Sequence, residues 1–182
     1  MSAPFSISII VPAYNAAGFI DECLAHIVPQ MGPAHELIVI DDGSRDDTAA
    51  RVQAQAAAAP QCALRLIRQA NQGLAQVRNV GLEQARGDYI LFIDSDDLLQ
   101  PGILARLDAV IASHHPDAIA LDFSMWHPDR PDKNLYTLTD PIGSAFDRRT
   151  IYRISVLSAK SPLLDALDCP DPATKTPRRG GG

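Results

Sequence analysis

Three carboxylates and a serine directly follow an apolar segment near the middle of the chain, as Asp94-Ser95-Asp96-Asp97. Residues 89–93, just before them, are mostly apolar and predict a buried strand. Like charges gathered at an apolar boundary lose hydration and repel one another. A divalent cation relieves both costs, and Mg²⁺ or Mn²⁺ held by one or two carboxylates keeps positions open for phosphate oxygens. The cluster indicates a metal-bridged phosphate ligand; the alternative is a polar turn whose aspartates cap the next helix.

Segments with strand and helix character alternate over the first two-thirds of the chain. Continuous apolar segments predict strands at residues 7–11, 37–40, 64–67, 89–93 and 118–123. Apolar residues at helical spacing predict helices over 19–28, 46–59, 74–85 and 103–111, with Ser44 or Asp46 capping the second and Gly87 ending the third. Continuous apolar strands separated by helices indicate an α/β fold, with a mostly parallel sheet covered by helices on both faces.

Polar side chains follow each of the first four predicted strands. They are Tyr14 and Asn15 after the first, Asp41 and Asp42 after the second, Asn71 after the third, and residues 94–97 after the fourth. Right-handed crossovers bring the carboxyl ends of parallel strands to one edge, and ligands of open α/β sheets bind at that edge. Four successive strands that end in polar side chains are hard to explain by packing alone, so we expect a ligand site there.

Composition and charge exclude several broad classes of protein. With 182 residues, 46% of them hydrophobic, the chain can form a folded domain of ordinary size. Its net charge of −6 argues against a general nucleic-acid binder. No apolar stretch approaches the roughly 20 residues that span a bilayer, and no basic region precedes an apolar N-terminal run, so we expect neither a membrane span nor a signal peptide. Widely spaced Cys23, Cys62 and Cys169 predict reduced thiols in a cytosolic protein.

Three other sites that bind phosphate or gather aspartates at a sheet edge do not fit the sequence. The turn at residues 12–18 lacks the glycine-rich pattern of a dinucleotide site. No phosphate-binding loop ends in Lys-Ser or Lys-Thr, as P-loop nucleotidases require. In response-regulator receivers the acidic pair follows the first strand, whereas Asp41 and Asp42 follow the second.

Four fragments, in order and at matching spacing, resemble family 2 glycosyltransferases across residues 6 to about 123. They are residues 8–15 (SIIVPAYN), 39–46 (VIDDGSRD), 71–81 (NQGLAQVRNVG) and 87–97 (GDYILFIDSDD). The resemblance implies a GT-A (Rossmann-like) fold, a nucleotide-diphosphate sugar donor, and Mn²⁺ or Mg²⁺ as cofactor. It also implies transfer of the sugar in a single displacement, with inversion at the anomeric carbon.

The same resemblance implies the residues of the site. Those expected at the nucleotide sugar are Pro12, Ala13, Tyr14, Asp42, Asn71, Arg78, Asp94 and Ser95, and those expected at the metal are Asp94 and Asp96. Asp42 resembles the family aspartate that accepts a hydrogen bond from the base. A carboxylate acceptor suits the N–H edge of uracil, which favours UDP or dTDP over CDP, although GDP also offers N–H donors.

Several of these residues also have structural interpretations. Tyr14 could stack on a base or be a core aromatic residue. Arg78 could face the base and diphosphate or lie on a helix surface. Asp41 could share the base contact or cap the following turn. Asp97 fits a helix cap better than a position behind the metal.

The later part of the chain departs from the family pattern. We expect a nucleotide-sugar-binding domain over 1–125, an incomplete acceptor-side segment over 126–168 with one more short element in 146–168, and a disordered tail over 169–182. In the family, a carboxylate well after the metal motif removes the acceptor proton. Here the catalytic residue is unknown, since the surroundings of the late aspartates do not match; they are Asp165, Asp168 and Asp171.

Two further functions are alternatives to a glycosyltransferase. The first is a truncated, non-catalytic nucleotide-sugar-binding protein. The second is a sugar-nucleotidyltransferase, although the chain lacks the glycine-rich, basic opening of such enzymes. Because family members commonly build polysaccharides and lipid-linked glycans of the cell envelope, the resemblance implies a saccharide or lipid-linked acceptor. It also implies a cytoplasmic location, at the inner face of the cell membrane.

Overall fold

Strands and helices alternate along the chain in the order that the sequence predicts. The computed structural model describes residues 5–121 and 156–159. The strands are β1 (Phe5–Ala13), β2 (His35–Asp41), β3 (Ala63–Arg68), β4 (Gly87–Phe92), β5 (Ala118–Ala120) and β6 (Val156–Ala159). The helices are α1 (Ile20–Ile27), the short 3₁₀ helix η1 (Val28–Gln30), α2 (Thr48–Ala58), α3 (Leu74–Gln84) and α4 (Ile103–His114). Each predicted strand and helix is confirmed, with its ends moved by a few residues.

The strands form one sheet in the order β3-β2-β1-β4-β6-β5. β1 pairs in parallel with β2 and with β4, and β2 pairs in parallel with β3. β6 runs antiparallel to both β4 and β5. This arrangement confirms the predicted α/β fold with a mostly parallel sheet. It also brings a strand from residues 146–168, where one more short element is predicted, into the same sheet.

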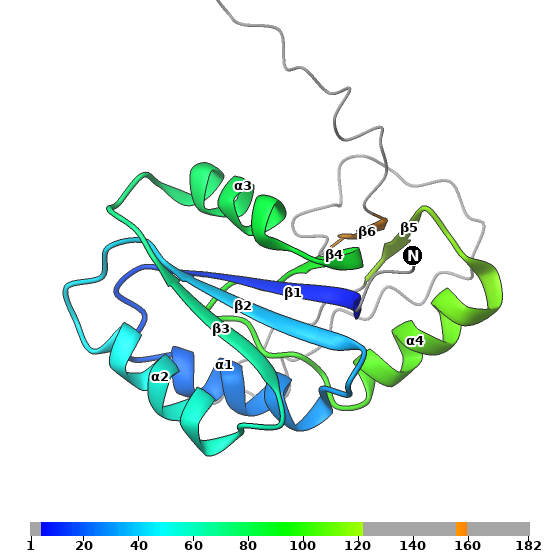
Figure 1. Cartoon of the computed structure of the whole chain (residues 1–182), viewed down its shortest axis with the longest axis horizontal. Helices are drawn as coiled ribbons and strands as arrows, with labels where there is room; N and C mark the ends of the chain where they lie inside the picture. The colour runs from blue at the N-terminus through cyan, green and yellow to red at the C-terminus, as the bar shows by residue number, and fades with distance from the viewer. Residues whose placement is uncertain (1–4, 122–155, 160–182) are drawn as a thin grey trace, which may run out of the picture.

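Helices cover both faces of the sheet, with α3 on one face and α1, α2 and α4 on the other (Figure 1). Side chains of β1 alternate between these layers. Ile7, Ile9 and Val11 lie in one hydrophobic cluster with residues of α1, α2 and α4, whereas Ile10 lies in a second cluster with Val77 of α3. β1 is therefore buried on both faces, which explains its continuous apolar sequence.

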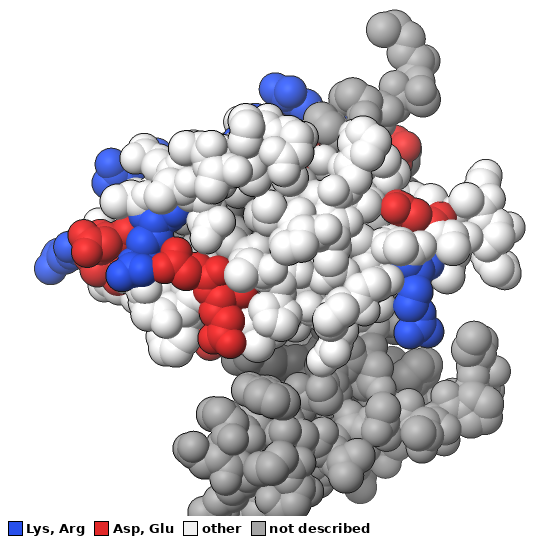
Figure 2. Space-filling view, turned by 90° about the horizontal axis from the view of Figure 1, so that it is seen from below, with Lys and Arg blue, Asp and Glu red and all other residues white. Residues whose placement is uncertain are grey.

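The face formed by α1, α2 and α4 is largely uncharged across its centre. Figure 2 views it from below and shows that acidic and basic side chains gather toward its sides. The sequence of α2, TAARVQAQAAA, carries a single charged residue, which accounts for part of this surface. In the part of the chain that the structure describes, no helix has the length and apolar character needed to cross a bilayer.

The carboxyl ends of β1, β2 and β4 meet at one edge of the sheet. Backbone hydrogen bonds continue the pairing just past the strands, from Asp42 N to Ala13 O (2.9 Å) and from Ile93 N to Ile10 O (3.0 Å). The polar segments that follow β2 and β4 therefore leave the sheet on either side of the end of β1. This position brings residues 14, 42 and 94 of the sequence to one place.

Gly87 begins β4 and does not end α3, whose C-cap residue is Ala85. A Cβ atom on Gly87 would lie 2.6 Å from Ser8 N and 2.8 Å from Ser8 Oγ. The prediction was wrong because the close approach of two strands, and not the end of a helix, requires glycine here. The sequence pattern of a helix followed by glycine is the same in both cases.

The N-cap residue of α2 is Asp47, where the sequence predicts Ser44 or Asp46. Asp46 still supplies a capping hydrogen bond from one position earlier, since its Oδ1 accepts the Thr48 N–H (3.1 Å). Ser44 faces the other way, and its Oγ accepts the Asn15 N–H (2.9 Å). Asp46 therefore bonds to the first turn of α2, whereas Ser44 bonds to the loop after β1.

A buried polar cluster fixes the opposite end of the sheet. The Glu36 carboxylate accepts hydrogen bonds from Ser8 Oγ (2.6 Å) and Arg86 N (2.6 Å) and pairs with Arg65 (3.2 Å). Ser8 Oγ in turn accepts the Gly87 N–H (2.8 Å). These partners belong to β1, β2, β3 and the start of β4. Glu36 therefore holds four strands in register at the end away from the polar edge.

The predicted domain boundaries fall largely outside the described residues. Of the segment 126–168 the structure describes only β6, and the tail 169–182 lies wholly outside it. Asp165, Asp168, Cys169 and Asp171 lie outside it as well. The division at residue 125 and the nature of the tail stay predictions.

Candidate functional site

A cleft of about 290 Å³ opens at the edge where β1, β2 and β4 end. Its lining residues are Pro12, Ala13, Tyr14, Asp42, Asn71, Gly73, Leu74, Val77, Asp94 and Ser95. Seven of the eight residues predicted at the nucleotide sugar are among them. The eighth, Arg78, contacts Asp94 from α3. The structure therefore gathers the predicted residues at one place, and their part in binding stays a prediction.

Tyr14 forms the wall of the cleft that follows β1. Pro12 and Ala13 are the last residues of the strand, and they direct the chain into the cleft. The Tyr14 side chain is 49% exposed. The alternative of a core aromatic residue is therefore wrong, and the ring is available for stacking on a planar ligand.

Asp42 lies at the bottom of the cleft, where its carboxylate holds the loop after β3. Its Oδ1 accepts hydrogen bonds from Gln69 Nε2 (2.8 Å) and Gln72 N (2.9 Å), and its Oδ2 accepts one from Gly73 N (2.8 Å). Only 3% of Asp42 is exposed. Burial alone would raise the pKa of Asp42, but the hydrogen bonds from Gln69, Gln72 and Gly73 outweigh it and lower the pKa. Asp42 is therefore an ionised acceptor facing the cleft.

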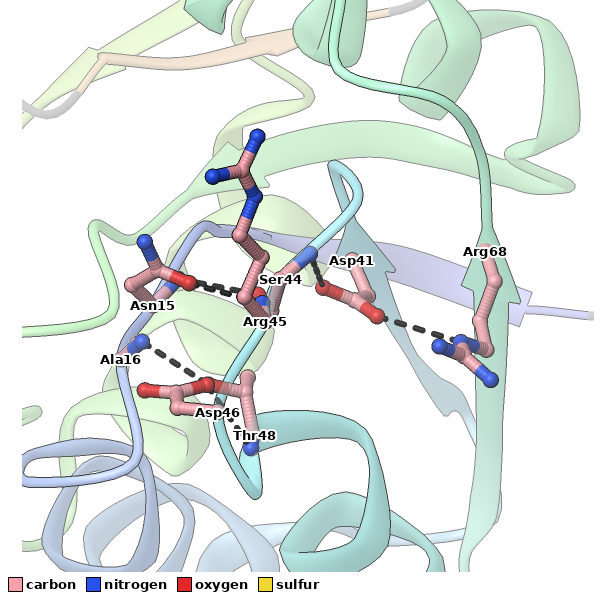
Figure 3. Close-up of polar contacts among 8 residues, drawn as sticks. All are labelled: Asn15, Ala16, Asp41, Ser44, Arg45, Asp46, Thr48 and Arg68. Carbon is pink, nitrogen blue, oxygen red and sulfur yellow. Dashed lines mark hydrogen bonds and ion pairs between the residues drawn. The ribbon is translucent and has the colours of Figure 1, made fainter.

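Asp41 makes different contacts from Asp42, although the two are adjacent in the sequence. Its Oδ1 accepts the Ser44 N–H (2.9 Å), and its Oδ2 pairs with Arg68 Nε (3.2 Å) (Figure 3). Asp41 is fully buried and does not line the cleft. The structure thus agrees with the interpretation that Asp41 caps the turn after β2.

The wall formed by α3 contains two apolar residues that the sequence did not predict in the site, Leu74 and Val77. Leu74 begins α3 and is half exposed, whereas Val77 is buried one turn later. Both belong to the apolar residues whose spacing predicts the helix over 74–85, but only Val77 is buried. The only signal in the sequence was the position of Leu74 directly after Gly73, a residue with φ +86° that turns the chain into the helix.

Two loops at the edge of the cleft approach each other closely at Gly43. A Cβ on Gly43 would lie 2.9 Å from Asn71 N, and Gly43 itself has φ +75°. Any other residue would both strain the backbone and push Asn71 away. The glycine therefore lets the loop after β3 lie directly on the loop after β2.

Arg78 and Asp94 form an ion pair across the cleft end of β4. Arg78 Nη2 lies 2.8 Å from Asp94 Oδ1, and the guanidinium also lies over the Phe92 ring, 5.7 Å from its centroid. Both side chains of the pair keep about a third of their surface exposed, at 38% and 30%. Arg78 is thus held at the site by two contacts and does not project freely from the helix surface.

The segment after β4 concentrates negative charge. Asp94 and Ser95 line the cleft, and Asp96 is exposed two residues beyond Asp94. Burial raises the pKa of the nearby Cys23 thiol to about 12, and the charges of Asp97, Asp96 and Asp94 add to that effect. Carboxylate oxygens of this kind are the donors that Mg²⁺ and Mn²⁺ prefer.

The residues fit a divalent cation that takes part of its coordination from a ligand. Among the described residues, no three His, Cys, Asp or Glu side chains converge on one point. Mg²⁺ and similar ions commonly bind through one or two carboxylates, with phosphate oxygens and water completing the shell. The prediction that Asp94 and Asp96 hold such a cation stays a prediction.

Asp97 does not cap the following helix. α4 begins at Ile103, its N-cap residue is Gly102, and Asp97 lies well before both. The Asp97 N–H instead donates to Asp94 O (2.9 Å), which closes a turn within the acidic segment. The predicted cap was wrong because an irregular stretch separates the acidic segment from the helix.

One protein-family model matches most of the chain. The model for glycosyl transferase family 2 matches residues 8–158, from within β1 to within β6. The chain belongs to glycosyl transferase family 2. The family match therefore reaches into β6, and the resemblance seen in the four sequence fragments is confirmed.

Relatives of known name or structure support the same family and fold. The glycosyltransferase EpsJ of Bacillus subtilis, itself described as uncharacterised, is 36% identical over 68% of this chain and 36% of EpsJ. TarS of S. aureus, solved with UDP-GlcNAc, is 35% identical with a TM-score of 0.59, over 63% of this chain and 33% of TarS. The mannosyltransferase PcManGT of Pyrobaculum calidifontis, solved with GDP-Man and Mn²⁺, is 30% identical with a TM-score of 0.57. The match covers 64% of this chain and 36% of PcManGT. This family 2 chain thus spans about a third of each of these proteins.

Proposed function

We propose that this chain forms the donor site of a metal-dependent glycosyltransferase, which moves a sugar from a nucleoside-diphosphate donor to an acceptor hydroxyl. The observation that carries the proposal is the cleft at the carboxyl edge of the sheet. An exposed aromatic ring, a buried ionised carboxylate and an acidic segment with an arginine surround one space there. Family membership and the nucleotide-sugar complex of TarS support the same function.

Uridine and thymidine are the nucleosides that the described contacts of Asp42 favour. A carboxylate offers about four lone-pair positions. Hydrogen bonds from Gln69, Gln72 and Gly73 occupy two positions on Oδ1 and one on Oδ2. One further N–H donor can therefore be accepted at Oδ2, and the imide N–H of uracil or thymine is such a single donor. Guanine presents two neighbouring donors, and cytosine has an acceptor in place of the imide N–H.

The size of the cleft suits the nucleoside part of the donor. Its volume of about 290 Å³ lies at the lower end of the range for ligand pockets, which is about 300–1,000 Å³. With the base between Tyr14 and Asp42, the diphosphate would extend toward Asp94 and the sugar beyond it. The sugar contacts would then come largely from residues outside the described part of the chain.

Asp94 and Asp96 are the proposed ligands of Mn²⁺ or Mg²⁺. When bound, a divalent cation neutralises the charge that develops on the departing diphosphate. The Mn²⁺ complex of PcManGT supports the choice of ion. Arg78, beside Asp94, would add a second positive charge to the same leaving group.

The proposed chemistry is a single displacement with inversion. The acceptor oxygen forms a bond to the anomeric carbon, the bond from that carbon to the diphosphate oxygen breaks, and a carboxylate takes the acceptor proton. Within the described residues we assign no group to this last task. The acceptor would be a saccharide or a lipid-linked glycan of the cell envelope, reached at the inner face of the cell membrane.

A series of separate titrations tests the proposed nucleoside preference. We would titrate the full chain calorimetrically with UDP, dTDP, CDP, GDP and pyrophosphate, each in Mn²⁺. UDP and dTDP should bind about tenfold more tightly than CDP, since cytosine has an acceptor at the ring nitrogen where uracil and thymine carry the imide N–H. Equal binding of UDP and CDP would argue against base contact by Asp42, and tighter binding of GDP would overturn the preference for uracil or thymine.

Two further measurements separate transfer from binding and test the role of Asp42. In Asp42→Ala, affinity for UDP should fall more than affinity for pyrophosphate, because the base contact is lost. Release of UDP from a UDP-sugar on addition of a saccharide acceptor distinguishes a transferase from a protein that only binds its donor. Binding without release in the presence of acceptors would favour the second function.

A further inference from the structure

We propose that Asn15 is a positioning residue, which fixes Tyr14 at the base side of the cleft by latching the loop after β1 to the loop after β2. The inference rests on the proposed donor site, because its consequence for binding passes through Tyr14. It assigns no contact with the ligand to Asn15 itself.

Asn15 makes two hydrogen bonds to the second loop, in opposite directions. Its N–H donates to Ser44 Oγ (2.9 Å), and its Oδ1 accepts the Arg45 N–H (2.8 Å) (Figure 3). A reciprocal pair of this kind fixes both the distance and the relative orientation of the two loops. The second loop is itself fixed, since the Ser44 N–H donates to the buried carboxylate of Asp41 (2.9 Å).

The backbone of Asn15 is in the left-handed region, with φ +48°. Among non-glycine residues, asparagine is one of the few that adopt this conformation readily. The turn separates two neighbours with opposite surroundings, since Tyr14 is exposed in the cleft and Ala16 is only 3% exposed in the core. The conformation of Asn15 therefore lets the chain turn from the exposed Tyr14 directly to the buried Ala16.

The hydrogen bonds of Asn15 to the second loop, which we call the latch, are continued by those of the next two residues. Three successive backbone N–H groups, those of Asn15, Ala16 and Ala17, donate to side-chain oxygens of the second loop and the start of α2. The acceptors are Ser44 Oγ, Thr48 Oγ1 (2.8 Å) and Asp46 Oδ2 (3.0 Å). A hydrogen bond from Thr48 Oγ1 helps to lower the pKa of Asp46, so that its carboxylate stays ionised.

The hydrogen bonds of the loop after β1 determine whether its backbone N–H groups can bind an anion. Successive backbone N–H groups often form a nest that binds phosphate. Here they are occupied by side chains of the protein, so this loop contributes no free backbone donors from Asn15, Ala16 or Ala17 to an anion. Its contribution to the cleft is the Tyr14 side chain, and the latch keeps that ring in place before the ligand arrives.

Two substitutions separate the backbone role of Asn15 from its side-chain role. Asn15→Gly keeps the left-handed conformation but removes Oδ1. Asn15→Asp keeps an acceptor in the same position and tolerates the same conformation, so it should restore the latch. Thermal unfolding of both variants shows whether the fold is intact.

The first readout is the affinity of the full chain for UDP and for pyrophosphate, each measured in Mn²⁺. In Asn15→Gly, affinity for UDP should fall about five- to tenfold, with affinity for pyrophosphate nearly unchanged. In a Tyr14→Ala background, Asn15→Gly should change UDP affinity by less than about twofold, because the residue acts through the ring. Equal losses for UDP and pyrophosphate, or a full loss that persists without Tyr14, would overturn the inference.

The second readout does not depend on any ligand. Amide hydrogen exchange of Arg45 N–H should be faster in Asn15→Gly than in the wild type and normal in Asn15→Asp. A wild-type chain that binds no UDP would contradict the proposed function, and the latch would then be judged on exchange alone. Unchanged protection of Arg45 in Asn15→Gly would contradict the latch even if UDP binds.

Discussion

Arg78 Nη2 lies 2.8 Å from Asp94 Oδ1, so a side-chain cation already neutralises one of the two carboxylates proposed to hold the metal. The pair is partly exposed, and pairs of this kind contribute at most about 1 kcal/mol. A divalent ion can therefore displace or share the guanidinium at small cost. The same guanidinium is then free to face the diphosphate.

Replacing Arg78 should affect the metal and the nucleotide in opposite directions. In Arg78→Gln, Mn²⁺ alone should bind about two- to fivefold more tightly, because Asp94 loses its competing partner. UDP in the presence of Mn²⁺ should bind more weakly, because a positive charge beside the diphosphate is lost. Titration of Mn²⁺ followed by electron paramagnetic resonance measures the first effect and calorimetry the second. Arg86→Gln, which replaces an exposed arginine two residues past the end of α3, is the charge-matched control. Weaker binding of both ligands would contradict competition between Arg78 and the metal.

Asp96→Ala should abolish metal-dependent UDP binding with little loss of stability. Asp96 is exposed at the edge of the sheet, and surface substitutions usually change the free energy of unfolding by less than about 0.5 kcal/mol. Asp88→Ala, an exposed aspartate at the start of β4, is the control and should leave binding unchanged. Unchanged UDP binding by Asp96→Ala in Mn²⁺ would remove Asp96 from the metal site.

The ionised Asp42 should make stability depend on pH in the acid range. Its pKa is lower in the folded chain than its ordinary value, so its contribution is complete above the ordinary value of about 3.9. That contribution is lost as the pH falls through the pKa of the folded state. Asp42→Asn should therefore be clearly less stable than the wild type near neutral pH and differ less from it in acid. Urea unfolding between about pH 3 and pH 7 checks this. A gap that widens toward low pH would contradict the assigned sign.

Gly81→Ala should destabilise the fold, although alanine favours an exposed helix by about 1 kcal/mol over glycine. A Cβ on Gly81 would lie 2.5 Å from Ile10 Cγ2 and 3.2 Å from Ile40 Cδ1. Overpacking of this kind costs about 1–3 kcal/mol, and it would move α3, which carries Leu74 and Val77. Thermal unfolding measures the loss. Asn79→Ala, at an exposed position of the same helix, should be neutral or slightly stabilising. A Gly81→Ala chain as stable as Asn79→Ala would show that α3 can shift without cost.

The sequence predicts the sheet and its polar edge well, because both depend on simple periodicity. Continuous apolar strands have to be buried on both faces, and parallel strands have to end on the same side. That reasoning is enough to bring Tyr14, Asp42 and Asp94 together. The cleft confirms their proximity.

Periodicity alone does not distinguish neighbours of the same type, and only the family resemblance separates Asp42 from Asp41. Asp41 and Asp42 are chemically identical, but successive side chains of a strand point to opposite sides. Which of the two faces the cleft depends on the twist of the sheet and on the place of Arg68 in β3. The latch at Asn15 escaped prediction for a related reason, since its hydrogen-bond partners lie about thirty residues away in another loop.

Calorimetric titration of the full chain with UDP, in Mn²⁺ and then in EDTA, tests the central claim most directly. A donor site built on Asp42, Asp94 and Asp96 predicts that UDP binds in Mn²⁺ and that EDTA weakens or abolishes binding. Equal binding in both solutions would contradict the metal site. Absence of binding to UDP, and to dTDP and GDP titrated in the same way, would contradict the donor site itself.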